Sequence, residues 1–299
     1  MRIGITSDLH LEHDAALVRG AQAQASEGLT DGMAIRWWQH LLMREASVGH
    51  PRLGPDLAPL RGVDLILMAG DVWKGVQAIA YAQEVSDYIG CSVVVVAGNH
   101  DFYGLEMTEA TRDMAIAASE TKGRVSFLDD SRADFVIDGR RIAVLGSTLW
   151  TDYDLLGNDK RASSMKTALN GLNDHNCIAY TGISFQPRHA LELHHRSRAW
   201  LADEVPKAVK DADVIIVVTH HGVVPEANPP VYRQGNLAPA FASDMVGDIR
   251  RRNCDLVASG HTHHPLDMTI GRTRIISSPR GYIGTEPTAA RYIPLVVEL

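Results

Sequence analysis

Five short segments rich in metal-ligand residues lie along this chain, and each follows a hydrophobic run. They are Ser7-Asp8-Leu9-His10, Gly70-Asp71-Val72, Gly98-Asn99-His100-Asp101, Thr219-His220-His221 and Gly260-His261-Thr262-His263. The runs before them have the composition of buried strands. In open α/β sheets, ligands gather outside the carboxyl ends of the strands. The pattern therefore predicts an α/β fold whose polar side chains collect at one sheet edge.

Hydrophobic periodicity predicts the elements between these segments. Strands are expected near residues 2–6, 64–69, 92–97, 124–128, 134–138, 141–146, 214–218, 256–258, 266–270, 273–277 and 292–298. Helices are expected near residues 33–47, 75–89, 107–121, 188–209 and 239–252. Residues 50–62 read as a loop, and residues 149–187 as a long excursion over the surface with short helices. The alternation of strands and helices indicates βαβ units and a largely parallel sheet in the first half.

Composition excludes several classes of protein. The 299 residues include 36 acidic and 29 basic side chains, a formal net charge of -7, which argues against a nonspecific duplex-binding surface. No apolar run approaches the ~20 residues of a membrane span. Three cysteines at unrelated spacings are expected to be reduced thiols of a cytoplasmic protein. A cleaved signal peptide would remove ligand residues near the N-terminus, so secretion is not expected.

The first two segments offer carboxylates beside a histidine. Asp8 and His10 are two residues apart, so in extended backbone both side chains face one ion. As an isolated pair, they are more typical of a turn aspartate and a surface histidine. Asp71 follows a glycine that permits a tight turn, and its two oxygens can bridge two ions. The alternative for Asp71 is an N-terminal cap of the next helix.

The third segment is more specific than the first two. Asn99 offers a neutral carbonyl oxygen to a metal. His100 can donate a proton or hold a phosphoryl group. Asp101 can hydrogen-bond the imidazole of His100 and raise its pKa. The alternative reading is an ordinary polar turn.

Histidines supply the remaining candidate ligands. His261 and His263 follow Gly260, and His220 ends another strand and is favoured over its neighbour His221. Imidazole ligands suit Mn, Fe and Zn, whereas Mg prefers an all-oxygen shell. The other nearby histidines are assigned either a supporting role or an ordinary surface role; these are His13, His221 and His264.

Taken in order, the five segments resemble the signature of the calcineurin-like metallophosphoesterase superfamily. The resemblance spans residues 8–263 and implies a four-layer α/β sandwich of two mixed β-sheets flanked by helices. It implies one domain over residues 1–299, with pocket-shaping insertions near 13–60 and 150–187. The first insertion carries Trp37 and Trp38.

The resemblance also implies roles for individual residues. A first ion would be held by Asp8, His10 and His263. A second ion would be held by Asn99, His220 and His261. Asp71 would bridge both ions, His100 would be the catalytic histidine and Asp101 would orient it. Asn99 and Arg280 are further expected to contact substrate, Arg280 through its planar guanidinium fork, with a surface-loop arginine as the alternative.

The resulting hypothesis is hydrolysis of a small-molecule phosphate ester by water that a metal pair activates. A phosphodiesterase is favoured over a phosphomonoesterase, because a monoester requires more cationic groups than Arg280 supplies. His100 would assist the leaving alkoxide or stabilise the equatorial oxygens. Less favoured alternatives are a nuclease, a non-catalytic binding module and a zinc-dependent amide hydrolase. Mn is the favoured metal, with Fe or Zn as alternatives, and the sequence leaves the oligomeric state open.

Overall fold

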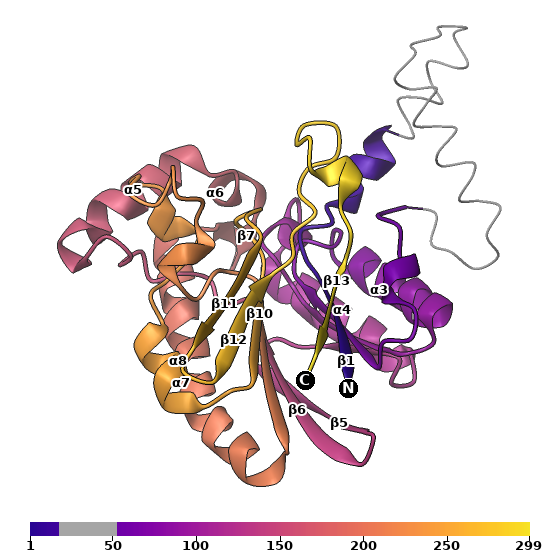
Figure 1. Cartoon of the computed structure of the whole chain (residues 1–299). Coiled ribbons are helices and arrows are strands. Elements are labelled where there is room, and N and C mark those ends of the chain that lie inside the picture. The colour runs from indigo at the N-terminus through magenta and orange to yellow at the C-terminus, as the bar shows by residue number, and fades with distance from the viewer. Residues whose placement is uncertain (18–52) are drawn as a thin grey trace, which may run out of the picture.

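Two β-sheets lie face to face at the centre of the molecule (Figure 1). This computed structural model describes residues 1–17 and 53–299. The first sheet has the order β13-β1-β2-β3-β4. Its strands are β1 (Arg2–Thr6), β2 (Leu65–Ala69), β3 (Ser92–Val96), β4 (Val125–Phe127) and β13 (Leu295–Glu298). The strands from β1 to β4 run parallel, and β13 is antiparallel to β1.

The second sheet has the order β11-β12-β10-β9-β6-β5. Its strands are β5 (Ser131–Ile137), β6 (Arg140–Ser147), β9 (Val214–Thr219), β10 (Leu256–Ser259), β11 (Leu266–Ile270) and β12 (Thr273–Ser277). The four central strands are parallel, and the two edge strands β5 and β11 are antiparallel to their neighbours. Both large sheets are therefore mixed. A short hairpin of β7 (Ala179–Tyr180) and β8 (Ile183–Ser184) stands apart from them.

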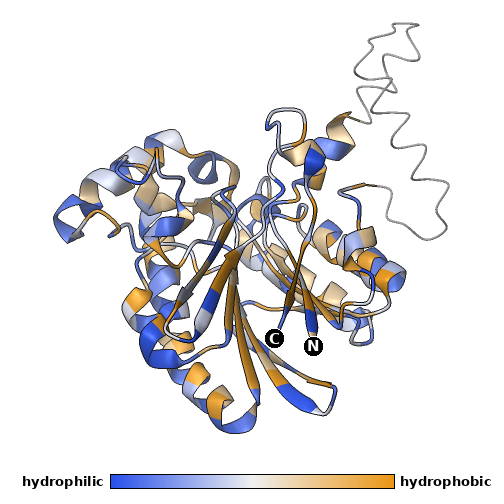
Figure 2. Ribbon diagram, viewed as in Figure 1, coloured by the Kyte–Doolittle hydropathy of each residue, from blue (hydrophilic) through white to orange (hydrophobic). Residues whose placement is uncertain are grey.

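Strand β2 illustrates why the predicted strands are continuous hydrophobic runs. Leu65, Leu67 and Ala69 point into the core between the two sheets, whereas Ile66 and Met68 pack into the core beneath the helices. Because alternate residues of a strand face opposite sides, a strand buried on both faces needs apolar residues throughout. Figure 2 shows the apolar strands inside and the polar surfaces of the helices outside.

Helices cover the outer face of each sheet. The first sheet packs against α3 (Val76–Ile89) and α4 (Met107–Glu120), and the second against α7 (Pro187–Asp211) and α8 (Val246–Arg252). This arrangement confirms the predicted four-layer sandwich. Gly90 ends α3 in the left-handed region at φ 89°, where glycine carries no steric penalty. No helix among the described residues is long and apolar enough to cross a membrane.

Most predicted elements agree with the structure to within a few residues, and two differ. The helix expected at 239–252 begins only at Val246, because Pro239 lies in a short 3-10 turn, Ala238–Ala240, and irregular residues follow it. The strand expected at 292–298 is shortened to β13. The excursion at 149–187 contains short helices as expected, α5 (Arg161–Gly171) and α6 (Asp174–Cys177). The helix expected at 33–47, with most of the 13–60 insertion, lies outside the described residues.

Candidate active site

The five ligand segments converge at the carboxyl ends of β1, β2, β3, β9 and β10. Backbone hydrogen bonds join them: the amide of Asp8 donates to Gly70 O at 3.0 Å, and the amide of Gly260 donates to His220 O at 2.9 Å. Five candidate ligands adopt left-handed backbone with φ between 47° and 71°; they are Asp8, His10, Asp71, His261 and His263. Such conformations cost about 1–3 kcal/mol each and cluster at functional sites. The fold thus holds these residues in strained turns outside the sheet edge.

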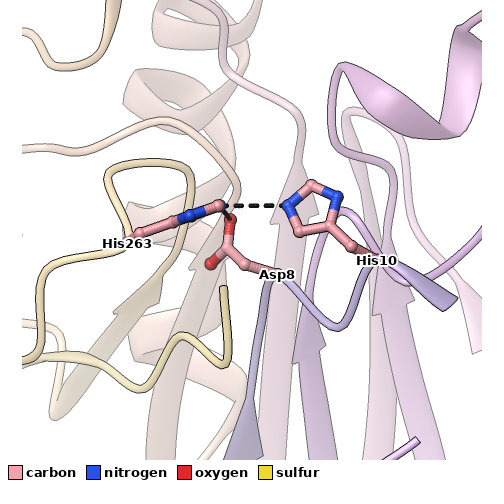
Figure 3. Close-up of side chains that lie close together, drawn as sticks. All are labelled: Asp8, His10 and His263. Carbon is pink, nitrogen blue, oxygen red and sulfur yellow. Dashed lines mark hydrogen bonds and ion pairs between the residues drawn. The ribbon is translucent and has the colours of Figure 1, made fainter. Parts of the chain in front are cut away.

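Asp8, His10 and His263 form what we call the first group (Figure 3). The Nε2 atoms of His10 and His263 lie 3.0 Å apart, and Nε2 of His263 lies 3.6 Å from Oδ1 of Asp8. Nδ1 of His10 lies 3.2 Å from Glu12, and Nδ1 of His263 lies 2.6 Å from Glu286. A carboxylate accepts its hydrogen bond from an N–H, so in the neutral imidazoles both Nε2 lone pairs face the centre of the group.

Asp71, Asn99, His220 and His261 form the second group. Nε2 of His220 lies 3.4 Å from Oδ2 of Asp71 and 3.0 Å from Oδ1 of Asn99. Nδ1 of His220 contacts Ala69 O at 2.9 Å, and the Asn99 amide donates to Asp174 at 2.8 Å. Because Nδ1 of His220 and the Asn99 amide nitrogen are engaged in these contacts, the Nε2 lone pair of His220 and Oδ1 of Asn99 face each other. A cation bound between these two acceptors would satisfy both.

Asp71 links the two groups. Its Oδ2 lies 3.6 Å from Nε2 of His10 in the first group and 3.4 Å from Nε2 of His220 in the second. Burial alone would raise the pKa of Asp71, but the neighbouring His220 and His100 outweigh it and hold the pKa well below its usual range. The same Asp71 carboxylate opposes the effect of burial on His220 and raises the pKa of His220 to about 9.

Each group contains one buried polar atom that supports a metal ion there. Oδ2 of Asp8 and Nε2 of His261 have no hydrogen-bond partner in the part of the chain that the structure describes. An unpaired buried polar atom costs about 1–3 kcal/mol. Carboxylate, amide and imidazole donors together suit Mn, Fe or Zn. The residues present therefore fit divalent metal ions.

His100 lies beside both groups rather than within either. Its backbone amide donates to Oδ1 of Asp71 at 2.8 Å, and its ring stacks on Tyr103 with centroids 4.1 Å apart. Nδ1 lies 3.3 Å from Glu12, and Nε2 lies 3.1 Å from the hydroxyl of Tyr282. Burial disfavours the imidazolium, but Asp71 and Glu12 outweigh it and raise the pKa of His100. The ring is thus held in place with Nε2 as its outward nitrogen.

The predicted contact between Asp101 and the imidazole of His100 is not formed. Oδ2 of Asp101 accepts from the amides of Asp71 at 2.8 Å and Gly98 at 2.7 Å, and Oδ1 accepts from the amide of Trp73 at 3.3 Å. In the short 3-10 turn His100–Phe102, adjacent side chains point in different directions, and that of Asp101 turns inward. Asp101 therefore joins the turns after β2 and β3, and Glu12 contacts His100 instead.

Arg280, which was predicted to contact substrate, lies in a buried ion pair. The Arg280 guanidinium is 4% exposed and donates to both carboxylate oxygens of Asp14, at 2.5 and 2.9 Å. It also donates to Leu9 O at 3.0 Å. Arg280 thus forms a buried ion pair beneath the turn that carries Asp8 and His10, and its charge is neutralised there.

Sequence reasoning missed five residues whose side chains hydrogen-bond a candidate ligand or His100; these are Glu12, Tyr103, Asp174, Tyr282 and Glu286. Glu12 follows His10 by two residues and Tyr103 follows Asn99 by four, and these spacings were available signals. The other three lie far along the chain from their partners and carried no signal. Of the spare histidines, His221 is buried with its ring 4.2 Å from that of His261 and its Nδ1 3.2 Å from Thr148 O.

Comparisons with known proteins identify the family and the fold. Residues 1–265 match the model of a family described as calcineurin-like phosphoesterase. No curated protein matches the sequence at a significant level. The phosphopantetheinyl hydrolase of Mycobacterium tuberculosis is similar in structure, with a TM-score of 0.62, 16% identity and coverage of 94% of this chain and 89% of that one. A putative 5'-nucleotidase from Staphylococcus aureus gives a TM-score of 0.45 at 15% identity, covering 92% and 48%.

Proposed function

The chain belongs to the calcineurin-like phosphoesterase family, and from that premise we propose that it hydrolyses a small-molecule phosphodiester with two divalent metal ions. Metal-dependent hydrolysis of a phosphoester follows from the family. The preference for a diester and the use of two ions are our proposals. One observation carries the preference: Arg280, the cation that the sequence motifs offered for a dianionic monoester, is neutralised by Asp14.

In this proposal the first group holds one ion, the second group holds the other, and Asp71 contacts both. Bound metal ions supply a water of lowered pKa and neutralise charge on the phosphoryl oxygens. The chain's own contribution is to fix the ligands before substrate arrives. Glu12 and Glu286 hold imidazoles of the first group, and Asp174 holds Asn99 of the second. We favour Mn over Fe or Zn.

His100 is the proposed proton donor to the leaving alkoxide. Its Nδ1 is occupied by Glu12, so Nε2 is the nitrogen that can reach a substrate. A raised pKa keeps a larger share of the ring protonated near neutral pH, which a general acid requires. The Tyr282 hydroxyl beside Nε2 supplies a further hydrogen-bonding group at the reacting ester.

Carboxylates surrounding the site support a substrate with a single negative charge. Glu12, Asp174 and Glu286 lie in contact with its histidines or with Asn99. A dianionic monoester would meet greater repulsion from them than a monoanionic diester. We also propose that the 150–187 insertion helps to shape the pocket, because it supplies Asp174.

The test is a substrate panel assayed with added Mn. It should contain a chromogenic diester, the matching monoester, cyclic nucleotides, a phosphopantetheinyl ester and single-stranded nucleic acid. We expect the diester kcat/KM to exceed that of the monoester by about tenfold or more, since each tenfold step requires only ~1.4 kcal/mol. A reversed preference would make the protein a phosphomonoesterase.

His100→Ala is the control for the chemistry. It should bind Mn as the wild type does and lose about 10²- to 10⁴-fold in turnover, the usual contribution of a general acid. If the wild type bound no metal and turned over no ester, the non-catalytic module would replace our proposal. If His100→Ala retained wild-type activity on every substrate, the proposed role of His100 would be wrong.

A further inference from the structure

Glu12 hydrogen-bonds two histidines that have different tasks, and His13 lies at the longer distance of 3.9 Å. Its Oε1 lies 3.2 Å from Nδ1 of His10, a ligand of the first group, and 3.3 Å from Nδ1 of His100. The two imidazole rings meet edge to face, with centroids 4.5 Å apart and an interplanar angle of 76°. One carboxylate oxygen therefore joins the metal-ligand residue and the proposed proton donor.

The contact with Glu12 determines which nitrogen of each ring remains available to a metal ion or a substrate. An ionised carboxylate only accepts hydrogen bonds, so Nδ1 of each histidine carries a proton of its own and donates it to Glu12. Nε2 of His10 then faces His263 and Asp71, and Nε2 of His100 faces outward toward Tyr282. The Glu12 side chain is 17% exposed, which keeps the arrangement largely shielded from competing water.

Glu286 provides a natural comparison within the same site. It also places a carboxylate on Nδ1 of a first-group histidine, at 2.6 Å from His263. Its side chain is 31% exposed, and its hydrogen bonds are with His263 and the amide of Tyr282. Glu12 and Glu286 thus share one kind of contact, and Glu12 alone of the two also contacts His100.

We propose that Glu12 is a positioning residue that couples His100 to the first metal-ligand group. It orients the proton donor through the same oxygen that orients His10, so both are aligned by one side chain. This role rests on the proposed function of His100. In this proposal Glu12, rather than the sequence neighbour Asp101, orients the ring of His100.

The experiment compares Glu12→Gln, Glu286→Gln and His100→Ala on aryl methyl phosphate diesters whose leaving groups range from p-nitrophenol to phenol. A more basic leaving group depends more on protonation. We expect Glu12→Gln to lower kcat about 10- to 100-fold, the usual effect of losing an outer contact to a ligand. Its loss should increase with the basicity of the leaving group, as in His100→Ala. Glu286→Gln should lose activity equally across the series.

A double-mutant cycle separates the two contacts of Glu12. In a His100→Ala background, Glu12→Gln should cost clearly less than in the wild type, because part of its effect acts through His100. Additive losses and a flat leaving-group profile would overturn the coupling. If the wild type itself turned over none of these diesters, the proposed function would fail, and the next measurement would still decide the role of Glu12.

That measurement uses metal-free protein and needs no activity. The ring N–H proton of His100, assigned by its absence in His100→Ala, should appear far downfield in nitrogen-edited proton spectra because of the bond to Glu12. Glu12→Leu should remove or move that resonance, whereas Glu286→Gln should leave it in place. An unchanged resonance in Glu12→Leu, with the protein folded, would show that Glu12 does not hold His100.

Discussion

The two ligand groups are supported in different ways. In the first group, Glu12 and Glu286 hold the imidazoles through carboxylates that are 17% and 31% exposed. In the second group, His220 is held by a backbone carbonyl, and Asn99 by the buried Asp174. Support by side chains can be changed by substitution without moving a strand, but the support of His220 by the backbone of β2 cannot. The first group is therefore the more adjustable half of the site, whereas in the second group His220 is tied to the sheet and only Asn99 depends on a side chain.

The largest expected effect comes from Asp71, which lies between the two ligand groups. Asp71→Asn should weaken metal binding at both groups and lower turnover on the order of 10⁴-fold, since metal ions contribute several kcal/mol to such reactions. Metal analysis and steady-state kinetics would measure both effects. Asp267→Asn, on exposed β11, is the matched control and should change neither. Loss of a single metal in Asp71→Asn would show that the groups are independent.

The ion pair beneath the first group should affect stability next most strongly. Arg280→Met leaves the buried Asp14 carboxylate unpaired, which should lower the free energy of unfolding by about 3 kcal/mol or more. The double variant Arg280→Met, Asp14→Leu should recover most of that loss. Urea denaturation of metal-free protein would measure it. If Arg280→Met had a normal unfolding midpoint and a raised KM, Arg280 would instead be a substrate-binding residue.

A more selective effect is expected in the second group. Asp174→Leu removes the acceptor of the Asn99 amide and of the Tyr103 hydroxyl, which lies 2.5 Å away. Metal affinity at this group should decrease about 10- to 100-fold, and Asp174→Asn should restore part of it. Titration with Mn, followed at both groups, would measure the change. Equal weakening of the two groups would contradict the division of the site.

The strands and the ligand residues could be predicted because their signals are local. Each ligand follows a run of aliphatic residues, and the parallel order of β1, β2 and β3 brings the carboxyl ends together. Asp101 shows where local reasoning fails. It is adjacent to His100 in sequence, but the turn directs its carboxylate to the backbone amides of Asp71 and Gly98.

Distance along the chain explains the other misses. Arg280 pairs with Asp14 across 266 positions, and Tyr282 meets His100 across 182. A single sequence contains no signal for such contacts. The late start of α8 has a different cause. The periodicity of 239–245 is helical, but Pro239 lies in a short 3-10 turn and irregular residues follow it, so the helix begins only at Val246.

The smallest effect is the pH dependence of metal-free stability. Asp71 outweighs burial and raises the pKa of His220 to about 9, so the protonated ring stabilises the folded, metal-free protein. A raised pKa gives stability that is complete below the unfolded value, ~6.5, and is lost as pH rises through 9. Metal ions bind the unprotonated ring, so the opposite trend applies to their affinity.

Melting temperatures of metal-free and Mn-loaded protein between pH 6 and 9.5 would test this. The gap between the two melting temperatures should widen as pH rises, because the free energy of stabilisation by metal grows by up to ~1.4 kcal/mol per pH unit for each proton released. Glu286→Gln should reduce the pH dependence that comes from the first group, because burial disfavours protonated His263 and Glu286, together with Asp8, raises its pKa. The pH dependence that comes from His220 should remain in that variant, because its partner Asp71 is unchanged. A gap independent of pH in both proteins would mean that metal binding displaces no proton from either group.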